Sequence, residues 1–249
     1  MMDISITILT KNNSQTISRT LNSLLDFDEV LIYDNGSSDA TIETARKFKN
    51  VKVIEGPFLG FGPTHNLASS LTKHDWILSL DSDEVLSMEL VSEIQNLVKD
   101  PDTVYSFPRH NYYREKFIRG CGWYPDRQFR LYNRNCTKFT SVEVHEQIIV
   151  DGCIHVPLNH PIIHYSYTSI EDFLQKMQVY STLFAKEHCG KKKSSPMKAI
   201  LHGAYAFIKT FIIKRGFIDG YEGLLISSYN AHTSYYKYMK LYEANKLLI

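Results

Sequence analysis

The sequence has few cysteines and no long apolar run. Its four cysteines are dispersed, and no two form a C-x-x-C pair; they are Cys121, Cys136, Cys153 and Cys189. Dispersed thiols at this density are typical of a reduced protein, so no disulfide framework is expected. No uncharged stretch approaches the roughly 18 residues of a membrane-spanning helix, and the first residues lack the pattern of a signal peptide. We therefore expect a cytoplasmic protein.

Two glycine-rich phosphate-binding motifs are also missing. The sequence contains no G-x-x-x-x-G-K-[ST] motif, and no G-x-G-x-x-G follows the first expected strand. A diphosphate ligand would therefore be held by a metal ion and not by a glycine-rich loop. The absence also weighs against a nucleotidyltransferase, which normally has a glycine-rich first loop with a lysine.

Acidic residues are scarce in the last quarter of the chain. Residues 186–249 contain 11 Lys and Arg but 4 Asp and Glu, whereas residues 1–185 contain 17 and 23. A basic tail on an acidic body indicates contact with phosphate, nucleic acid or an anionic membrane, or else a solvated helical face. The tyrosines of the tail come with no recognised nucleic-acid motif, so no nucleic acid is expected as a partner.

Strand-like and helix-like patterns alternate through the first part of the chain. Strands are expected over residues 4–9, 30–33, 51–54, 76–80 and 104–107, and helices after Ser14 and over 40–48, 64–71 and 88–98. This alternation predicts an α/β fold with a mostly parallel sheet and helices on both faces.

The alternation stops after Phe107. A short strand is expected over 147–150, followed by helices over 170–187, 197–213 and 220–248. We expect an α/β domain over residues 1–165 and a helical C-terminal extension over 166–249.

Three of the expected strands end in polar residues. Thr10-Lys11-Asn12 follows the first strand, Asp34-Asn35-Gly36-Ser37 the second, and Asp81-Ser82-Asp83 the fourth. Ligands of open parallel sheets bind at the carboxyl ends of the strands. A single acidic turn is ordinary turn chemistry, but Asp81 and Asp83 together can reach one hard cation that bridges to diphosphate oxygens.

Four segments in this order carry a family resemblance: ISITILTKNNS, LNSLLDFDEVLIYDNGSSDAT, GFGPTHNLA and DWILSLDSDEVLS. They resemble family 2 glycosyltransferases of the Rossmann-like GT-A fold. The later segments RGCGWYPDRQFRLYNR, VHE, HYSYTSIEDFLQKMQVYS and FIDGYEGLLISSY resemble the bacterial lipopolysaccharide-core β-glucosyltransferase group. The resemblance spans nearly the whole chain.

The resemblance implies a nucleotide-sugar site at the strand ends. Thr10, Asn12 and Asp34 would line the nucleotide pocket, with Asp34 reading the uracil or the ribose. Asp81 would hold the ribose or a metal-bound water, and Asp83 would bind Mg²⁺ or Mn²⁺.

Several further positions complete or modify this comparison. Asn66 would lie near the donor, and His164 is a candidate metal ligand, because GT-A enzymes often have a late histidine; the alternative is a histidine that is simply hydrogen-bonded. The chain has Asn13, Asn35 and His65 where an acid, a second Asp or Ser, and an Arg or Lys are common. These differences concern the contacts with the nucleobase and the phosphates of the donor, and leave the metal site unaffected.

Inverting transfer requires a carboxylate that accepts the proton of the acceptor hydroxyl. Asp126 is the expected base because it resembles the acidic motif that follows the sheet in this family, and its aromatic neighbours can stack on a sugar. Arg127 and Arg130 would engage phosphate or a charged acceptor. Alternatively, Asp126 pairs with an adjacent arginine in a structural turn. Glu146 is the second candidate base, or else it orients a loop.

The resemblance implies an inverting transferase that moves a hexose, glucose from UDP-glucose, to a lipopolysaccharide inner-core sugar or another glycan or lipid-linked acceptor. The alternatives are a protein, peptide or other polysaccharide glycosyltransferase of the same fold, and an inactive nucleotide-sugar-binding module.

The C-terminal extension contains an amphipathic segment with three alternative roles. From Ile200, an apolar face with lysines around it either packs on the α/β domain, forms an oligomer contact, or lies on an anionic membrane surface as a peripheral contact.

Overall fold

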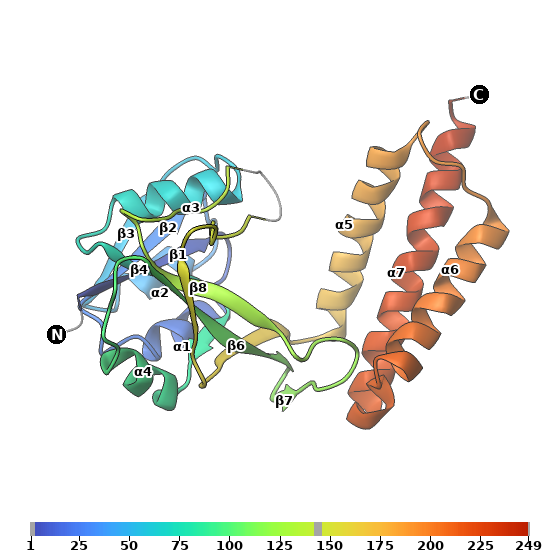
Figure 1. Cartoon of the computed structure of the whole chain (residues 1–249). Coiled ribbons are helices and arrows are strands. Elements are labelled where there is room, and N and C mark those ends of the chain that lie inside the picture. The colour runs from blue at the N-terminus through green and yellow to red at the C-terminus, as the bar shows by residue number, and fades with distance from the viewer. Residues whose placement is uncertain (1–2, 142–145, 249) are drawn as a thin grey trace. The chain divides into compact units, whose positions relative to one another are not determined.

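The computed structural model describes residues 3–141 and 146–248, which form two compact units (Figure 1). The first unit comprises the residues up to Arg109 together with Asp126–His164. The second comprises His110–Pro125 together with the residues from Tyr165 to the C-terminal end. The short segment 110–125 therefore belongs to the helical unit, although it lies before residue 165 in the sequence.

The described part of the first unit is a mixed sheet with four helices. In chain order its elements are β1 (Ile4–Thr10), α1 (Ile17–Asn22), β2 (Glu29–Asp34), α2 (Thr41–Ala45), β3 (Val51–Glu55), α3 (Phe61–Ser70), β4 (Trp76–Asp81), β5 (Glu84–Leu86), α4 (Met88–Gln95), β6 (Thr103–Tyr113), β8 (Arg127–Asn133), β9 (Ile154–Pro157) and β10 (Ile162–Tyr167). The strand order is β3-β2-β1-β4-β8-β6-β10-β5, and β9 also pairs with β6. β6 and β10 each continue into the second unit.

The parallel part of the sheet is β3-β2-β1-β4. In its register Thr10 of β1 is opposite Asp34 of β2, and Leu9 is opposite Asp81 of β4. β8 then pairs antiparallel with both β4 and β6. The α/β fold is thus confirmed. Beyond β4 the pairing is mixed, since β10 is antiparallel to β5 whereas β9 is parallel to β6.

Helices cover both faces of this sheet, as the alternation predicts (Figure 1). On one face Ile6 of β1 and Ile32 of β2 are fully buried in a cluster with Leu21 of α1 and Leu90 of α4. On the other face Leu31 and its neighbours on β2 pack against α3. Alternate residues of each strand point to opposite faces, so a strand buried on both faces is apolar throughout. Burying each such side chain stabilises the fold by about 1.5–3 kcal/mol.

The second unit consists mainly of three long helices. Its elements are β7 (Lys116–Phe117), α5 (Ile170–His188), α6 (Pro196–Ile208), the π-helix η1 (Lys209–Ile213), the 3₁₀-helix η2 (Gly216–Asp219) and α7 (Tyr221–Lys246). α7 packs against both α5 and α6. A Cβ atom on Gly203 of α6 would lie 3.2 Å from the backbone oxygen of Ala231 on α7, so glycine allows close approach of these helices.

Side-chain caps mark the starts of α4, α5 and α6, whereas α1, α2, α3 and α7 begin without one. Ser169 and Asp172 form a reciprocal capping box at the start of α5, and Ser195 caps α6 ahead of Pro196. Ser14 does not cap α1, because the helix begins only at Ile17 and its N-cap position is Thr16, whose side chain makes no capping hydrogen bond.

Two other expectations need correction. The strand expected over 147–150 is absent: Ile148 forms only an isolated bridge with Phe139. The helix expected over 197–213 is α-helical only to Ile208 and ends as the π-helix η1. Among the described residues, no helix combines the length and apolar character needed to cross a membrane.

Candidate active site

The ends of β1 and β2 are tied together by side-chain hydrogen bonds. Asn12 has a φ of 57°, and its Oδ1 accepts from the backbone N–H of Ser38 at 2.7 Å. The buried Thr10 hydroxyl accepts from the side-chain amide of Asn13 at 3.1 Å. The polar strand ends therefore lie side by side on one edge of the sheet, as expected for neighbouring parallel strands.

Asp34 is the most enclosed of these residues. Its side chain is buried, and its Oδ2 accepts from the backbone N–H groups of Gly36 at 2.9 Å and Ser37 at 2.8 Å. The Ser37 hydroxyl donates to the other carboxylate oxygen. Gly36 has a φ of 89°, which glycine adopts without strain. The carboxylate thus shapes the turn after β2, and its predicted contact with the uracil or ribose stays a prediction.

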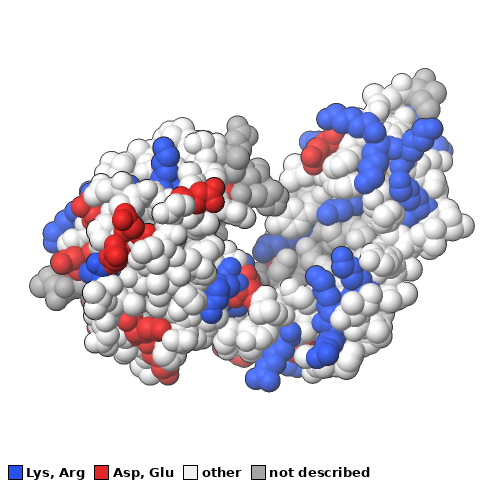
Figure 2. All heavy atoms as spheres, in the orientation of Figure 1, with Lys and Arg blue, Asp and Glu red and all other residues white. Residues whose placement is uncertain are grey.

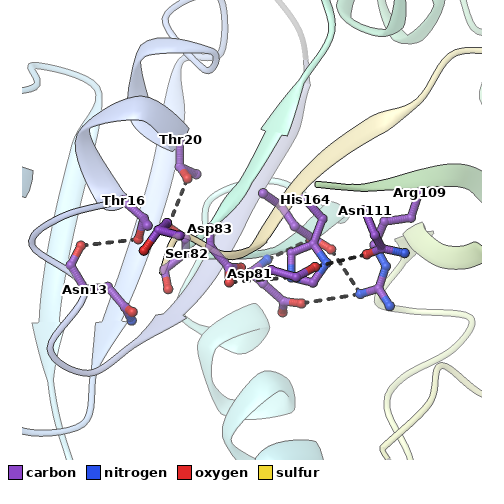
Figure 3. Close-up of polar contacts among 12 residues, drawn as sticks. Asn13, Thr16, Thr20, Asp81, Ser82, Asp83, Arg109, Asn111 and His164 are labelled. Atoms are coloured by element: carbon purple, nitrogen blue, oxygen red, sulfur yellow. Dashed lines mark hydrogen bonds and ion pairs between the residues drawn. The ribbon is translucent and has the colours of Figure 1, made fainter. Parts of the chain in front are cut away.

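The end of β4 brings two aspartates and a histidine together (Figure 3). The antiparallel register of β5 and β10 places His164 opposite Glu84, beside the turn that carries Asp83. As a result, the Asp83 Oδ2 atom lies 3.5 Å from the His164 Nε2 atom. Thr20 of α1 donates to the backbone oxygen of Ser82 at 3.0 Å, which anchors this turn from the helix side.

A buried glutamate organises the arginines of the site. Glu84 is 0% exposed, and its Oε1 accepts from Arg130 Nη2 at 2.9 Å and from Arg109 Nη1 at 3.4 Å. Its Oε2 accepts from the backbone N–H of Asp81 at 3.0 Å. Because a buried carboxylate is costly without partners, both arginines are held around Glu84.

Each of these arginines also contacts a candidate functional carboxylate. Arg130 Nη2 donates to Asp81 Oδ2 at 2.7 Å. Arg109 Nε donates to Asp126 Oδ2 at 2.7 Å, because the β6–β8 register brings Arg109 next to the start of β8. Glu84 is therefore linked through Arg130 to Asp81, which is predicted to contact the donor, and through Arg109 to Asp126, which is the predicted base.

The protonation states follow from this arrangement. Partial burial works to raise the pKa of Asp81, but Arg130, with His164 and His65, outweighs it and holds that pKa at about 2. Complete burial raises the pKa of Glu84, and the charge of Arg130 opposes the rise. Burial lowers the pKa of His65 to about 4, so this histidine is neutral at pH 7.

Two predicted residues, Arg127 and Asn66, have mainly structural contacts. Arg127 Nη1 donates to the backbone oxygens of Ser106 at 2.9 Å and Leu158 at 3.1 Å. The Asn66 side chain is hydrogen-bonded to the backbone of Phe139 in both directions. The predicted donor contacts of Arg127 and Asn66 therefore stay predictions.

The second candidate base lies at the edge of the described region. Glu146 is partly buried. It directly follows residues 142–145, so its neighbours Val144 and His145 in the VHE segment lie outside the described residues. The role of Glu146 as a base is likewise still a prediction.

The donor atoms at the end of β4 suit a divalent cation. Within residues 3–141 and 146–248, no group of three or more His, Cys, Asp or Glu side chains is arranged as a complete metal site. Asp83 and His164 nevertheless present one carboxylate and one imidazole nitrogen 3.5 Å apart, a separation that two ligands of one ion can span. Oxygen and imidazole donors suit Mn²⁺, and a ligand diphosphate would supply the remaining oxygens.

Sequence reasoning missed Glu84, Arg109 and the packing of His65. Glu84 follows Asp83 directly in the sequence. Only the apolar residues near it could have indicated that its carboxylate is buried. Arg109 lies 17 residues before Asp126, with no sequence periodicity connecting the two. His65 stacks on Phe139 and contacts the Ser79 hydroxyl at 3.2 Å, so it occupies a packed position where the family commonly has a cation.

Comparison with known proteins identifies the family. The model described as Glycosyl transferase family 2 matches residues 5–149, more than half of the chain. The chain belongs to glycosyltransferase family 2. The matched range contains Asp34, Asp81, Asp83 and Asp126, whereas His164 lies outside it.

Whole-chain relatives agree with the family assignment. An uncharacterized glycosyltransferase, RP128, of Rickettsia prowazekii (strain Madrid E) is 33% identical over 265 residues, covering 97% of this chain and 87% of the relative. The lipopolysaccharide core biosynthesis glycosyltransferase LpsC of Rhizobium meliloti (strain 1021) is 21% identical over 257 residues, covering 99% and 94%.

Solved structures show the same fold. The mannosyltransferase PcManGT from Pyrobaculum calidifontis, in complex with GDP-Man and Mn²⁺, matches with a TM-score of 0.51 at 11% identity, over 92% of this chain and 73% of that chain. The Rossmann-like GT-A sheet predicted for this family 2 glycosyltransferase is thereby confirmed at the level of the fold.

Proposed function

We propose that this glycosyltransferase transfers glucose from UDP-glucose to an inner-core sugar of lipopolysaccharide, with inversion at the anomeric carbon. The observation that carries the proposal is the grouping of Asp81, Asp83 and His164 at the end of β4, beside the ends of β1 and β2. The full-length similarity to the lipopolysaccharide core enzyme LpsC supports the acceptor class.

The donor would bind along the edge formed by the strand ends. In this proposal Thr10, Asn12 and Asp34 surround the nucleoside, and Asp81 faces the ribose or a metal-bound water. Asp83 and His164 would hold Mg²⁺ or Mn²⁺, which when bound neutralises charge developing on the leaving diphosphate. The mannosyltransferase of the same fold was solved with a nucleotide sugar and Mn²⁺, so this fold accommodates both.

Asp126 would act as the catalytic base. Its carboxylate accepts the acceptor O–H proton while the hydroxyl oxygen forms a bond to the anomeric carbon and the bond from that carbon to the diphosphate breaks. UDP leaves with the electron pair of the broken bond. Arg109 orients the Asp126 carboxylate through the 2.7 Å hydrogen bond to Oδ2, and the second oxygen, Oδ1, accepts from the Gln128 side-chain amide at 2.7 Å.

The proposal places the enzyme in the cytoplasm, at the inner face of the membrane where a lipid-linked acceptor would be found. The same chemistry would serve a protein, peptide or other polysaccharide acceptor, so the acceptor must be tested directly. An inactive nucleotide-sugar-binding module is disfavoured by the presence of Asp81, Asp83 and Asp126.

A nucleotide-release assay tests the proposal. The purified chain is given UDP-glucose, UDP-galactose, UDP-N-acetylglucosamine or GDP-mannose, with Mg²⁺ or Mn²⁺ and delipidated inner-core oligosaccharide. We expect UDP release that depends on both UDP-glucose and the oligosaccharide. Faster turnover with another donor would reassign the sugar, and pyrophosphate release would indicate a nucleotidyltransferase.

The metal site is tested by Asp83→Ala. We expect loss of turnover and of metal-dependent UDP binding with an unchanged circular dichroism spectrum, because Asp83 supplies the proposed carboxylate ligand. Asp75→Asn, at a half-exposed aspartate that pairs with Arg134, is the matched control and should stay active. Full activity of the unaltered enzyme in EDTA would rule out metal dependence.

A further inference from the structure

The helical unit carries a continuous row of exposed apolar side chains. We name it the apolar stripe and define it by Ile200, Leu201, Tyr205, Ile208, Ile212 and Ile213. Each of these side chains is between 52% and 65% exposed. The stripe follows α6 and continues without a break along the π-helix η1.

Helical spacing puts the stripe on one face and the packing contacts on the other. Ala199, Gly203 and Thr210 are the buried residues of α6 and η1, and Gly203 faces α7. Leu201, Tyr205, Ile208 and Ile212 recur at intervals of four, three and four, so they cover the opposite face, and Ile200 and Ile213 extend it at either end. Single exposed apolar residues are ordinary, but a contiguous row of this length marks an interaction surface.

The surroundings of the stripe are strongly basic. Residues 189–221 contain seven Lys and Arg but one acid, Asp219. Asp219 is buried and accepts from the backbone N–H groups of Arg119 and Gly120, so its charge is engaged inside the unit. Figure 2 shows many Lys and Arg on the visible face of the helical unit and few Asp and Glu. Lys209, Lys214 and Arg215 are exposed at the end of the stripe itself.

We propose that the apolar stripe docks on an anionic lipid surface. An amphipathic helix with a basic border lies in the headgroup region, with its apolar side chains in the acyl boundary and its lysines near the phosphates. Each Lys or Arg at such a surface strengthens binding about fivefold, and salt weakens the effect.

A second copy of the chain fits the stripe less well. In a two-fold dimer the same patch meets itself, which would bring two sets of basic residues together with no acidic residues between them. The anionic lipid surface supplies the complementary charge that a second copy lacks. The docking itself is independent of the reaction, whereas its benefit to a lipid-linked acceptor rests on the proposed function.

Vesicle flotation of the full chain tests the proposal. Vesicles of phosphatidylcholine alone are compared with vesicles that also contain phosphatidylglycerol, at about 0.05 M and about 0.5 M salt, where screening differs severalfold. We expect binding to the anionic vesicles at low salt and its loss at high salt. Binding that is equal on the neutral vesicles would overturn the electrostatic part of the proposal.

Two pairs of variants locate the surface. Leu201→Asp/Ile208→Asp should weaken binding roughly tenfold or more, because two charges would enter the acyl boundary. The matched control, Leu174→Asp/Leu183→Asp, changes exposed apolar residues of α5 and should bind as the unaltered chain does. If both variants bind equally well, the stripe is not the docking surface.

The second pair separates charge from position. Lys209→Gln/Lys214→Gln/Arg215→Gln should reduce vesicle binding strongly, whereas Lys47→Gln/Lys49→Gln/Lys52→Gln removes the same charge from exposed positions of the first unit and should reduce it little. Lys192 and Lys198 are left unchanged because their ammonium groups lie 5.2 and 5.4 Å from the ring of the buried Tyr238, whereas Lys209 lies 6.0 Å from the ring of the exposed Tyr205.

Two further measurements distinguish failure of the docking proposal from failure of the proposed function. All variants are checked by circular dichroism and by UDP release with the delipidated acceptor, which the stripe variants should retain. A failed activity assay together with intact vesicle binding would count against the proposed function only. A concentration-dependent dimer that Leu201→Asp/Ile208→Asp dissociates, without vesicle binding by either form, would overturn the proposal in favour of self-association.

Discussion

The two units of this glycosyltransferase use charge in opposite ways. In the first unit, Asp81, Glu84 and Asp126 are held by Arg109 and Arg130 at distances of 2.7–3.4 Å. In the second unit, lysines and arginines border an exposed apolar stripe. Charges that are paired in the interior fix the position of reactive groups, whereas charges that face outward are available to a partner. Each prediction below perturbs one side of this comparison.

The largest effect is expected at Asp126. Asp126→Asn keeps the shape of the side chain but removes the proton acceptor, so kcat should fall by ~10²–10⁴-fold with UDP binding little changed. Steady-state kinetics and UDP titration by calorimetry measure the two quantities. If Glu146→Gln shows this pattern and Asp126→Asn does not, the base is Glu146.

The second largest effect is expected at the buried Glu84. Glu84→Gln removes one charge from a buried cluster, so the free energy of unfolding should fall by ~3 kcal/mol or more. Asp75→Asn removes one charge from a pair whose carboxylate is 52% exposed, and should cost less than ~1 kcal/mol. Urea unfolding of both variants makes the measurement. Equal losses would mean that burial does not distinguish the two pairs.

His65 makes the first unit sensitive to acid. Its pKa is about 4 in the folded protein and ~6.5 in an unfolded chain. Between these pH values the unfolded chain binds more protons, so stability should decline as the pH falls from ~6.5 to ~4, by up to ~3 kcal/mol. Metal-free urea unfolding at several pH values tests this. His65→Gln should flatten the dependence, and His232→Gln, at an exposed position of α7, should leave it intact.

The smallest effect is expected from a helix cap in the second unit. Ser169→Ala removes the side-chain half of the α5 capping box and should lower the free energy of unfolding by ~1 kcal/mol. Donor affinity, measured as UDP binding to the first unit, should not change. A weaker UDP affinity in this variant would show that the two units are energetically coupled.

Patterns of short range predicted the sheet well. The four strands β1 to β4 were placed within a residue or two, because apolar runs bounded by polar turns are visible in the sequence. The same runs predicted that Thr10, Asp34 and Asp81 would share an edge, since neighbouring parallel strands end together. The helices of the second unit were likewise evident from their length and periodicity.

Contacts of long range were not predictable in this way. The hydrogen bond from Arg130 to Asp81 joins residues 49 apart, and its existence depends on β8 pairing with β4 in antiparallel register. The alternation of strands and helices had instead suggested a mostly parallel sheet. For the same reason Arg109 and Glu84 were overlooked, because a residue that acts only through its partners has no motif of its own.

The arginine partners of the site have a consequence for ionic strength. Because Arg109 and Arg130 offset two of the three charges of Asp81, Glu84 and Asp126, the site has little net charge to act at a distance, and added salt should change the donor affinity little. The lysines and arginines beside the stripe have no acidic partners of this kind. Their attraction to an anionic lipid surface should weaken as salt shortens the Debye length. Raising the salt concentration should therefore release the chain from anionic vesicles while its donor stays bound.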